Sequence, residues 1–417
     1  MTAGLARLRL WSLCFLALSV SLGTALVSLG KLFLLLVVLA QIFTDVRQRN
    51  KPRDSQTVLA QAWPSSLWWG ATALLWMGLS MAWSATPVHE AWPSLARHAR
   101  WLVFPAAFYL MRAGTPAQPV LQSLVLGQLF VLVSSWLMVL GIPLPWAISV
   151  MSPDNAVVFS SSIEQPITCT LMMLVIWYFR DQWPLAQRRF WLWTAMALAT
   201  ANVLLVVTGR TGQMAMLLAW VFVLWGCLPG RYRWGVLLLP VLVALGVGLG
   251  SERMQQRWLK AKAEVLELQA GPLKIDNSMG FRIDAWQKSV HAFAEKPLLG
   301  HGVGAWPKAY VDQGGTIAKA NDPHQQFLLW AVESGLVGLV LFMGFLVGLW
   351  RNAQNLPWHA RWCLRSAVAI EVLTGLVNST LLGVSIGEFF LLLWAGLLAC
   401  HKQFPDDRSQ GFLPPSQ

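Results

Sequence analysis

Three side chains in this sequence are of types that act together on phosphate esters, namely Arg210, Arg282 and His324. A guanidinium presents paired N–H donors that match phosphate oxygens, so two arginines can stabilise the charge that grows on a departing diphosphate. A neutral imidazole can accept the proton of an attacking hydroxyl. The set therefore fits the transfer of a group from a lipid-linked diphosphate to a sugar hydroxyl.

The sequence around Arg210 predicts where this side chain lies. It stands in Thr208-Gly209-Arg210-Thr211-Gly212, between two apolar runs with almost no loop between them, which places it at a helix end. The two glycines permit a close backbone approach of the kind that an anionic ligand needs. The plainer interpretation is an arginine that anchors the helix end by extending its charge to the membrane surface.

The residues around His324 predict the start of a helix. Asp322 suits the N-cap, Pro323 suits the first helical position, and Gln325 follows three residues after the cap, where its side chain can reach the cap N–H. His324 is then expected in the first helical turn, where the helix dipole disfavours an imidazolium. A histidine that only caps the helix or lies at the interface is the alternative.

For the other candidate cations, a structural or lipid contact competes with a contact to substrate. Arg282 either binds an anion or forms a local ion pair with Asp276 or Asp284. Arg97 and Arg100 lie one turn apart at the expected outer start of a helix. There, contact with lipid headgroups or structural pairing is favoured over contact with a substrate.

Composition identifies the class of protein. Hydrophobic residues make up 56% of the 417 residues, charged residues make up 12%, and 25 residues are tryptophan, which is typical of a polytopic membrane protein. The net charge of +12 is explained by Lys and Arg at the cytoplasmic ends of helices and by contact with anionic lipid, so nucleic acid is not an expected partner. Glu371 and Glu388 fall inside apolar runs, where pairing within the bundle is favoured.

No metal or cofactor is expected from the sequence. The five cysteines show no metal-ligand spacing, and the acidic residues predicted outside the membrane form no Asp-x-Asp pattern.

The chain contains twelve apolar runs that are candidate membrane spans, taking about 20 residues as the usual length. They lie near residues 10–28, 30–45, 66–83, 99–112, 119–141, 163–180, 190–208, 212–228, 233–250, 325–350, 363–381 and 385–401. The short loops after every second span are rich in arginine, which predicts that both termini are cytoplasmic. The long polar interval before Pro323 is then outside, in the periplasm if the membrane is a bacterial inner membrane.

The predicted fold is therefore an all-α polytopic membrane protein with about twelve transmembrane helices and one large, mostly helical periplasmic loop. Residues 1–250 are expected to form an N-terminal bundle of about nine helices, 251–323 the periplasmic region, 324–401 about three C-terminal helices, and 402–417 a disordered cytoplasmic tail. Within the periplasmic region we expect an amphipathic helix over Glu252–Gln269 and a second helix over Gly280–Ala294. The glycines at 300, 302 and 304 are interpreted as turn residues rather than a phosphate loop.

The topology and several sequence motifs of this chain resemble the O-antigen ligase and polymerase superfamily, and most of all the O-antigen ligases of lipopolysaccharide biosynthesis, whose fold is GT-C-like. The resemblance covers the topology of the whole chain, but its motifs lie between Thr208 and Leu339. They are the Gly-Arg-Thr-Gly turn, Arg282, Pro297-Leu298-Leu299-Gly300-His301-Gly302-Val303-Gly304, Pro323-His324 and Glu333-Ser334-Gly335-Leu336-Val337-Gly338-Leu339. The chain departs from the family at Gly209, where serine is frequent, and at Gln325, where asparagine is frequent.

The resemblance implies a reaction. O-antigen would move from undecaprenyl diphosphate to a sugar hydroxyl of the lipid A–core oligosaccharide in the periplasm, without metal or ATP and with inversion at the anomeric carbon. Arg210 and Arg282 would hold the diphosphate, and His324 would activate the acceptor hydroxyl. Further contacts with substrate are expected from Arg97, Arg100, His301 and Gln325.

Other functions share the same motifs. An O-antigen polymerase joins two lipid-linked repeat units, and a protein O-oligosaccharyltransferase moves the glycan to protein. A different class is a transporter or flippase for an anionic lipid-linked glycan. Transporters usually hold ionisable groups near the membrane midplane, whereas here the charges other than Glu371 gather outside, which favours an enzyme.

Overall fold

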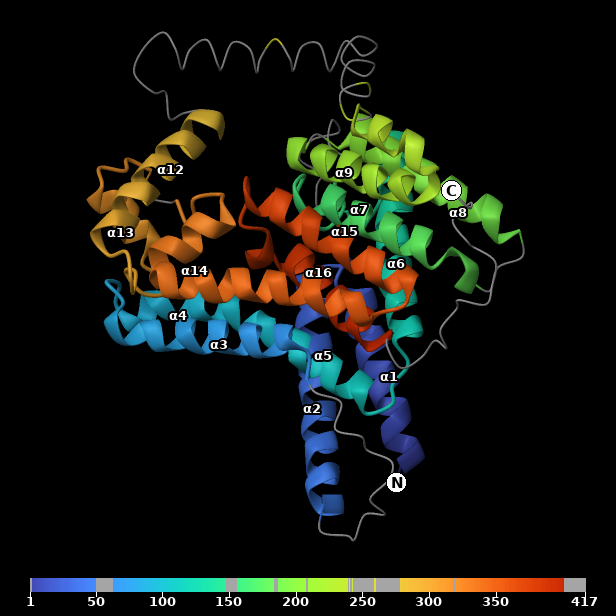
Figure 1. Cartoon of the computed structure of the whole chain (residues 1–417), viewed down its shortest axis with the longest axis horizontal. Coiled ribbons are helices and arrows are strands. Elements are labelled where there is room, and N and C mark those ends of the chain that lie inside the picture. Colours follow the sequence, from blue (N-terminus) through green and yellow to red (C-terminus); the bar gives the residue numbers. More distant parts are fainter. Residues whose placement is uncertain are drawn as a thin grey trace.

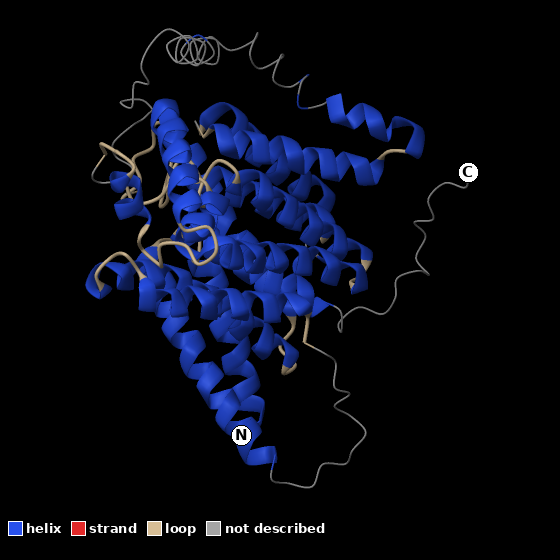
Figure 2. Ribbon diagram, turned by 60° about the vertical axis from the view of Figure 1, so that its left-hand side comes forward, coloured by secondary structure: helices blue, strands red, loops and turns tan. Residues whose placement is uncertain are grey.

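The computed structural model describes residues 2–49, 63–147, 156–183, 187–207, 209–238, 278–317 and 320–400, with isolated positions at 240, 242 and 259. In these described ranges every regular element is a helix and none is a strand (Figures 1 and 2). The predicted all-α class is confirmed. The expected amphipathic helix over Glu252–Gln269 and the C-terminal tail lie outside the described residues.

The helices follow one another with short connections. In the first half they are α1 (Thr2–Ser19), α2 (Thr24–Arg49), α3 (Ser65–Leu79), α4 (Val88–His98), α5 (Val103–Arg112), α6 (Ala117–Val139), α7 (Glu164–Tyr178), α8 (Arg188–Ala201) with a π-helical end at Asn202–Val206, and α9 (Arg210–Cys227). In the second half they are α12 (Ser278–Glu295), α13 (Trp306–Asp312), α14 (Gln326–Asn352), α15 (Trp358–Gly375) and α16 (Val384–Ala399).

Four helices in the described part are long and apolar enough to cross a membrane. They are Thr24–Arg47, Ala117–Val139, Arg188–Val206 and Gln326–Asn355, and Val384–Ala399 is a shorter apolar helix. These helices indicate an integral membrane protein, but they do not establish the twelve predicted spans. Some predicted spans are too short or too polar to be among the four helices: α3 has 15 residues, and α15 carries Arg361, Arg365 and Glu371.

The first predicted span, over residues 10–28, is wrong in its boundaries. The chain turns at Gly23, whose φ is +117°, so α1 ends at Ser19 and α2 starts at Thr24. The two helices lie side by side (Figure 1). A positive φ is readily adopted only by glycine, which explains why the apolar run divides at this residue. Most of the ninth predicted span, 233–250, lies outside the described residues.

Helix α14 is the central element that positions the site. It packs along α3 and also contacts α12, α13 and α15 (Figure 1). Its inner face carries Trp330, whose ring stacks on Phe342 at 5.1 Å between centroids and meets Trp101 at 5.4 Å. Burial of these large aromatic rings removes much apolar surface from water, which is favourable. The cluster therefore fixes α14 against its neighbours.

The periplasmic region predicted from the sequence contains α12 and α13, which contact each other and α14. The helix expected over Gly280–Ala294 is confirmed as α12. Trp306 and Tyr310 stack at 5.1 Å, and the Tyr310 hydroxyl donates to Asp284 Oδ2 at 2.7 Å. These contacts hold α13 on α12 as a small separate core.

A break at Gly335 divides α14 and is filled by the glycine-rich loop. Gly335 has φ +66° inside the helix. The N–H of Leu336 donates to the Pro297 carbonyl at 2.7 Å, and the N–H of Gly302 donates to the Glu333 carbonyl at 2.8 Å. Backbone groups that a broken helix leaves unpaired are thereby satisfied. Gly300, Gly302 and Gly304 all have positive φ, so the turn interpretation of these glycines is confirmed.

Candidate active site

Arg282 projects from α12 and is partly buried. Its Nη2 donates to Asn378 Oδ1 at 3.3 Å, and its Nε is buried with no hydrogen-bond partner. Burial lowers the pKa of Arg282, the charge of Arg210 lowers it further, and Asp322 opposes both effects. A guanidinium remains protonated through such a shift, so the shift reports a cation whose charge is poorly compensated. An anion bound between the two arginines would relieve their repulsion.

Arg210 is the exposed first residue of α9. A Cβ at the preceding Gly209 would collide with the carbonyl of Ser162, and a Cβ at Gly212 would collide with Pro166. The glycines therefore make room for Ser162 and the first turn of α7, and the predicted close approach is to protein rather than to a ligand. This contact also places Ser162 and the start of α7 beside the start of α9, which carries Arg210.

His324 is held by the residues on either side of it in space. Its N–H donates to Asp322 Oδ1 at 2.7 Å, and its Nδ1 lies 3.6 Å from the same oxygen. The ring meets the edge of Phe281 at 5.7 Å between centroids. The carbonyl of Pro323 accepts from Trp286 Nε1 at 3.0 Å. Two residues of α12 thus contact the Pro-His pair.

The predicted helix start at Asp322 is wrong. Helix α14 begins at Gln326, with Gln325 as N-cap, whose side chain accepts from the N–H of Leu328. His324 therefore precedes the helix, in a left-handed conformation with φ +50°. The Asp322 side chain accepts from the N–H of His324 rather than from the helix, and this bond forms an Asx turn. Gln325 is engaged in capping, and none of its described contacts is with the other candidate residues.

Two residues that the sequence did not single out join these groups. Asn378 accepts from Arg282 and donates through Nδ2 to Thr211 Oγ1 at 2.7 Å, next to Arg210. Ser379 Oγ donates to Asp322 Oδ1 at 2.9 Å. The three candidate catalytic residues, from α9, α12 and the segment before α14, are thereby brought into one neighbourhood.

Arg97 and Arg100 lie within electrostatic range of carboxylates of the protein. Arg97 acts electrostatically on the buried Glu333, and Arg100 acts on Glu388 and Glu164. Arg100 also donates from Nη1 to the Leu382 carbonyl. None of these described interactions involves the other candidate residues, so they leave the substrate contact expected of both arginines a prediction.

His301 is buried, and its described contacts are structural. Its Nε2 lies 2.8 Å from the Ala292 carbonyl, and its N–H donates to the Val332 carbonyl at 2.8 Å. These bonds tie the glycine-rich loop to α12 and α14. The expected contact of His301 with substrate is not supported by this position.

A signal for the missed residues is present in the sequence. Asn378, Ser379 and Thr380 are consecutive polar residues between two apolar runs, at the end predicted to face outside. Polar side chains at such a position need partners when helices close around them. The pattern indicates a polar junction, but it does not tell which distant side chains are the partners.

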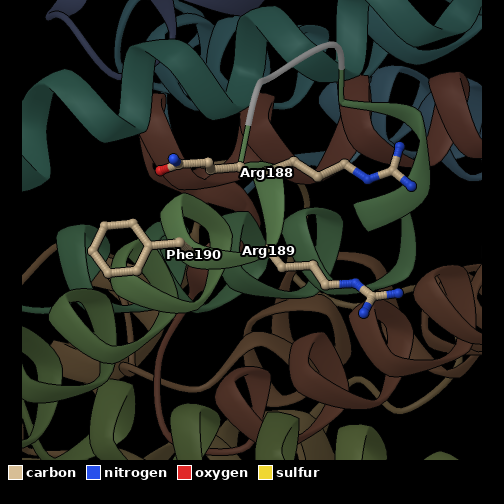
Figure 3. Close-up of a pocket in the computed structure, with 4 residues that line it drawn as sticks. Arg188, Arg189 and Phe190 are labelled. Carbon is tan, nitrogen blue, oxygen red and sulfur yellow. The ribbon is translucent and has the colours of Figure 1, made fainter.

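A pocket of about 610 Å³ at the start of α8 lies away from this cluster. It is lined by Gln187, Arg188, Arg189 and Phe190 (Figure 3). Arg210 follows the opposite end of the same helix with its π-helical extension. The pocket is therefore separate from the cluster of catalytic candidates.

The fold and the cluster define an integral membrane protein in which Arg210, Arg282 and His324 are linked through hydrogen bonds of Asn378, Ser379 and Asp322. Residues 195–343 match the family model described as O-antigen ligase. This match supports the predicted kinship with the O-antigen ligase and polymerase superfamily; it runs from α8 into α14 and contains Arg210, Arg282 and His324. The match supports a bacterial membrane enzyme. A search among curated proteins finds no match.

Proposed function

We propose that this chain is a glycan ligase that moves O-antigen from undecaprenyl diphosphate to a sugar hydroxyl of lipid A–core at the periplasmic face. The single observation that carries the proposal is the convergence on one site of Arg210, Arg282 and His324, linked through Asn378, Ser379 and Asp322. The family match contains all three catalytic candidates.

The proposed reaction needs only one proton transfer. His324 takes the proton of the acceptor hydroxyl while the hydroxyl oxygen attacks the anomeric carbon from the face opposite the diphosphate. The bond between that carbon and the diphosphate oxygen breaks, the configuration inverts, and undecaprenyl diphosphate leaves with the bonding electrons. Arg210 and Arg282 stabilise the charge that develops on it.

The position of Asp322 favours one nitrogen of His324 as the base. Its Oδ1 lies 3.6 Å from Nδ1, and a carboxylate on that side favours a proton on Nδ1, which leaves Nε2 to accept the proton of the hydroxyl. Phe281 covers the ring from one edge. The reaction as written uses no ATP, and it places the charge of the leaving group on guanidiniums.

The acceptor is tested by offering the purified protein three acceptors, namely lipid A–core, a second undecaprenyl-linked glycan and a protein, with one glycan donor linked to undecaprenyl diphosphate. We expect lipid A–core to be extended. Extension of a second undecaprenyl-linked glycan instead would identify a polymerase, and extension of a protein acceptor would identify a protein O-oligosaccharyltransferase. No product from any acceptor would contradict the proposed enzyme.

The role of Arg210 is tested by Arg210→Lys, which keeps the charge and removes the paired donors. We expect transfer to fall about tenfold or more, because a charged hydrogen bond is worth about 1.5–3 kcal/mol. Arg189→Lys, at the far end of α8, is the matched control and should keep the rate of the unmodified protein. Equal rates in both variants would return Arg210 to the role of a helix anchor.

A further inference from the structure

The loop between α15 and α16, residues 376–383, bonds to Arg282 and to the sequence neighbours of the other two catalytic candidates. Asn378 bonds to Arg282 on α12 and to Thr211 on α9. Ser379 bonds to Asp322, beside His324. The carbonyl of Leu382 accepts from Arg100. We call this segment the α15–α16 loop.

The bonds of Asn378 leave its amide only one orientation. A guanidinium has donors and no acceptor, so Oδ1 must face Arg282, and Nδ2 must then face Thr211 Oγ1. Asn378 is 3% exposed, so water cannot readily replace either partner. The side chain therefore sets the spacing between α12, which carries Arg282, and the start of α9, which carries Arg210.

The neutrality of Asn378 matters as much as its bonds. Arg210 and Arg282 are close enough for the charge of one to lower the pKa of the other. A carboxylate at position 378 would neutralise Arg282, whereas an amide oxygen holds it without cancelling its charge. The charge of Arg282 thus remains available to an anion.

Buried polar groups hold the α15–α16 loop from beneath. Thr380 Oγ1 lies 2.8 Å from both carboxylate oxygens of Glu371, and the N–H of Leu381 donates to Gln326 Oε1 at 3.2 Å. Glu371 and Gln326 are each 1% exposed. These bonds account for a carboxyl group inside α15, and they fix the loop that carries Asn378.

We propose that Asn378 is a positioning residue that holds Arg282 beside Arg210 without neutralising the charge of Arg282. The two guanidiniums together then bind the diphosphate of a lipid donor. This inference rests on the proposed function for the identity of the anion. It assigns to the α15–α16 loop, which lies outside the segment matched by the family model, the task of assembling the donor site.

Two variants of Asn378 separate this role from a purely structural one. Asn378→Asp keeps the shape, can still accept from Arg282, and can accept from the Thr211 hydroxyl. A structural role therefore predicts that it is milder than Asn378→Ala. The proposed role predicts the reverse for the donor: we expect KM for the lipid-diphosphate donor to rise about tenfold or more in Asn378→Asp, with kcat changed less.

A control shows what the loss of an ordinary interhelical amide does. Asn352 accepts from the backbone N–H of Ser66 at 3.0 Å, at the other end of α14. Asn352→Ala should lower the melting temperature while KM for the donor is unchanged. The Asn378 proposal is overturned if Asn378→Asp keeps the KM of the unmodified protein, or if Asn378→Ala alone raises it.

Binding of undecaprenyl diphosphate without a glycan, measured on protein in nanodiscs, supplies a readout that does not need transfer. If the unmodified protein binds this lipid and Asn378→Asp binds it about tenfold more weakly, the positioning role stands even if no acceptor is ever extended. If transfer occurs but both proteins bind equally, the positioning role fails and the proposed function stands. Absence of both binding and transfer in the unmodified protein overturns both.

Discussion

His324 has a backbone conformation that few residues other than glycine adopt, with φ +50°. Histidine is among the side chains that are found there more often than most. The carboxylate of Asp322 stabilises this conformation by accepting from the N–H of His324, and Ser379 in turn donates to Asp322. At the residue scale, the imidazole is thus oriented by an acid that touches its backbone and lies near its ring.

Asp322→Asn tests this arrangement, because the amide oxygen can keep the bond to the backbone while the charge beside Nδ1 is lost. We expect glycan transfer to fall about hundredfold, the size of loss that a misplaced catalytic group produces. Asp312→Asn, an exposed residue of α13, is the control and should transfer at the unmodified rate. A rate within twofold of the unmodified protein for Asp322→Asn would show that the carboxylate does not orient the base.

At the scale of elements, the break in α14 depends on one glycine. A Cβ at Gly335 would meet the Leu298 carbonyl, in a backbone conformation that side chains rarely adopt. We expect Gly335→Ala to destabilise the protein by about 2 kcal/mol or more. Gly78 on α3 has ordinary φ and open space where its Cβ would be, so Gly78→Ala should not lower the melting temperature. Equal melting curves for the two variants would mean that the break is not strained.

Helix α4 carries a pH-sensitive contact with α14. Burial lowers the pKa of His98 from its ordinary 6.5 to about 4, and its ring meets the edge of Trp330. Below pH 6.5 the unfolded chain takes up a proton that folded His98 does not. Folding stability should therefore fall as the pH drops from 6.5 to 4, by about 3 kcal/mol from this residue.

Melting temperatures between pH 7 and 4.5 test this contribution. His98→Phe should show a smaller decrease at low pH than the unmodified protein, since phenylalanine does not titrate. His89→Phe, an exposed position on the same helix, should retain the full decrease. If the two variants lose stability equally with falling pH, His98 does not control the effect.

Helices were predictable where an apolar run lies between polar turns, as in α6 and α16. The start of α14 was not, because Asp322 is the preferred N-cap type and the nearby sequence does not show that its carboxylate is engaged elsewhere. Ser379, distant in the chain, donates a hydrogen bond to the Asp322 carboxylate.

The types of the catalytic candidates could be predicted from the sequence, but their partners could not. The bond of Arg282 to Asn378 joins residues 96 positions apart. Such contacts depend on helix packing and leave no local pattern.

At the scale of the whole molecule, the sequence predicts which side of the membrane each helix end faces. Asp312 on α13 is expected outside and Arg189 on α8 inside. Cysteines placed at these positions, with Cys227 replaced by serine because it is exposed, can be labelled in intact cells with a maleimide that does not cross the inner membrane. We expect Asp312→Cys to react in intact cells and Arg189→Cys to react only after permeabilisation; the opposite pattern would invert the predicted topology.

The central claim is that His324 is the base for glycan transfer from a lipid diphosphate. The most direct measurement compares product formation by purified His324→Ala and His291→Ala, since His291 is an exposed histidine on α12 and serves as the matched control. With an undecaprenyl diphosphate-linked donor and lipid A–core, we predict that His291→Ala transfers glycan at the unmodified rate and that His324→Ala, equally well folded, forms product at least a hundredfold more slowly. Transfer by His324→Ala at the rate of its control would contradict the account.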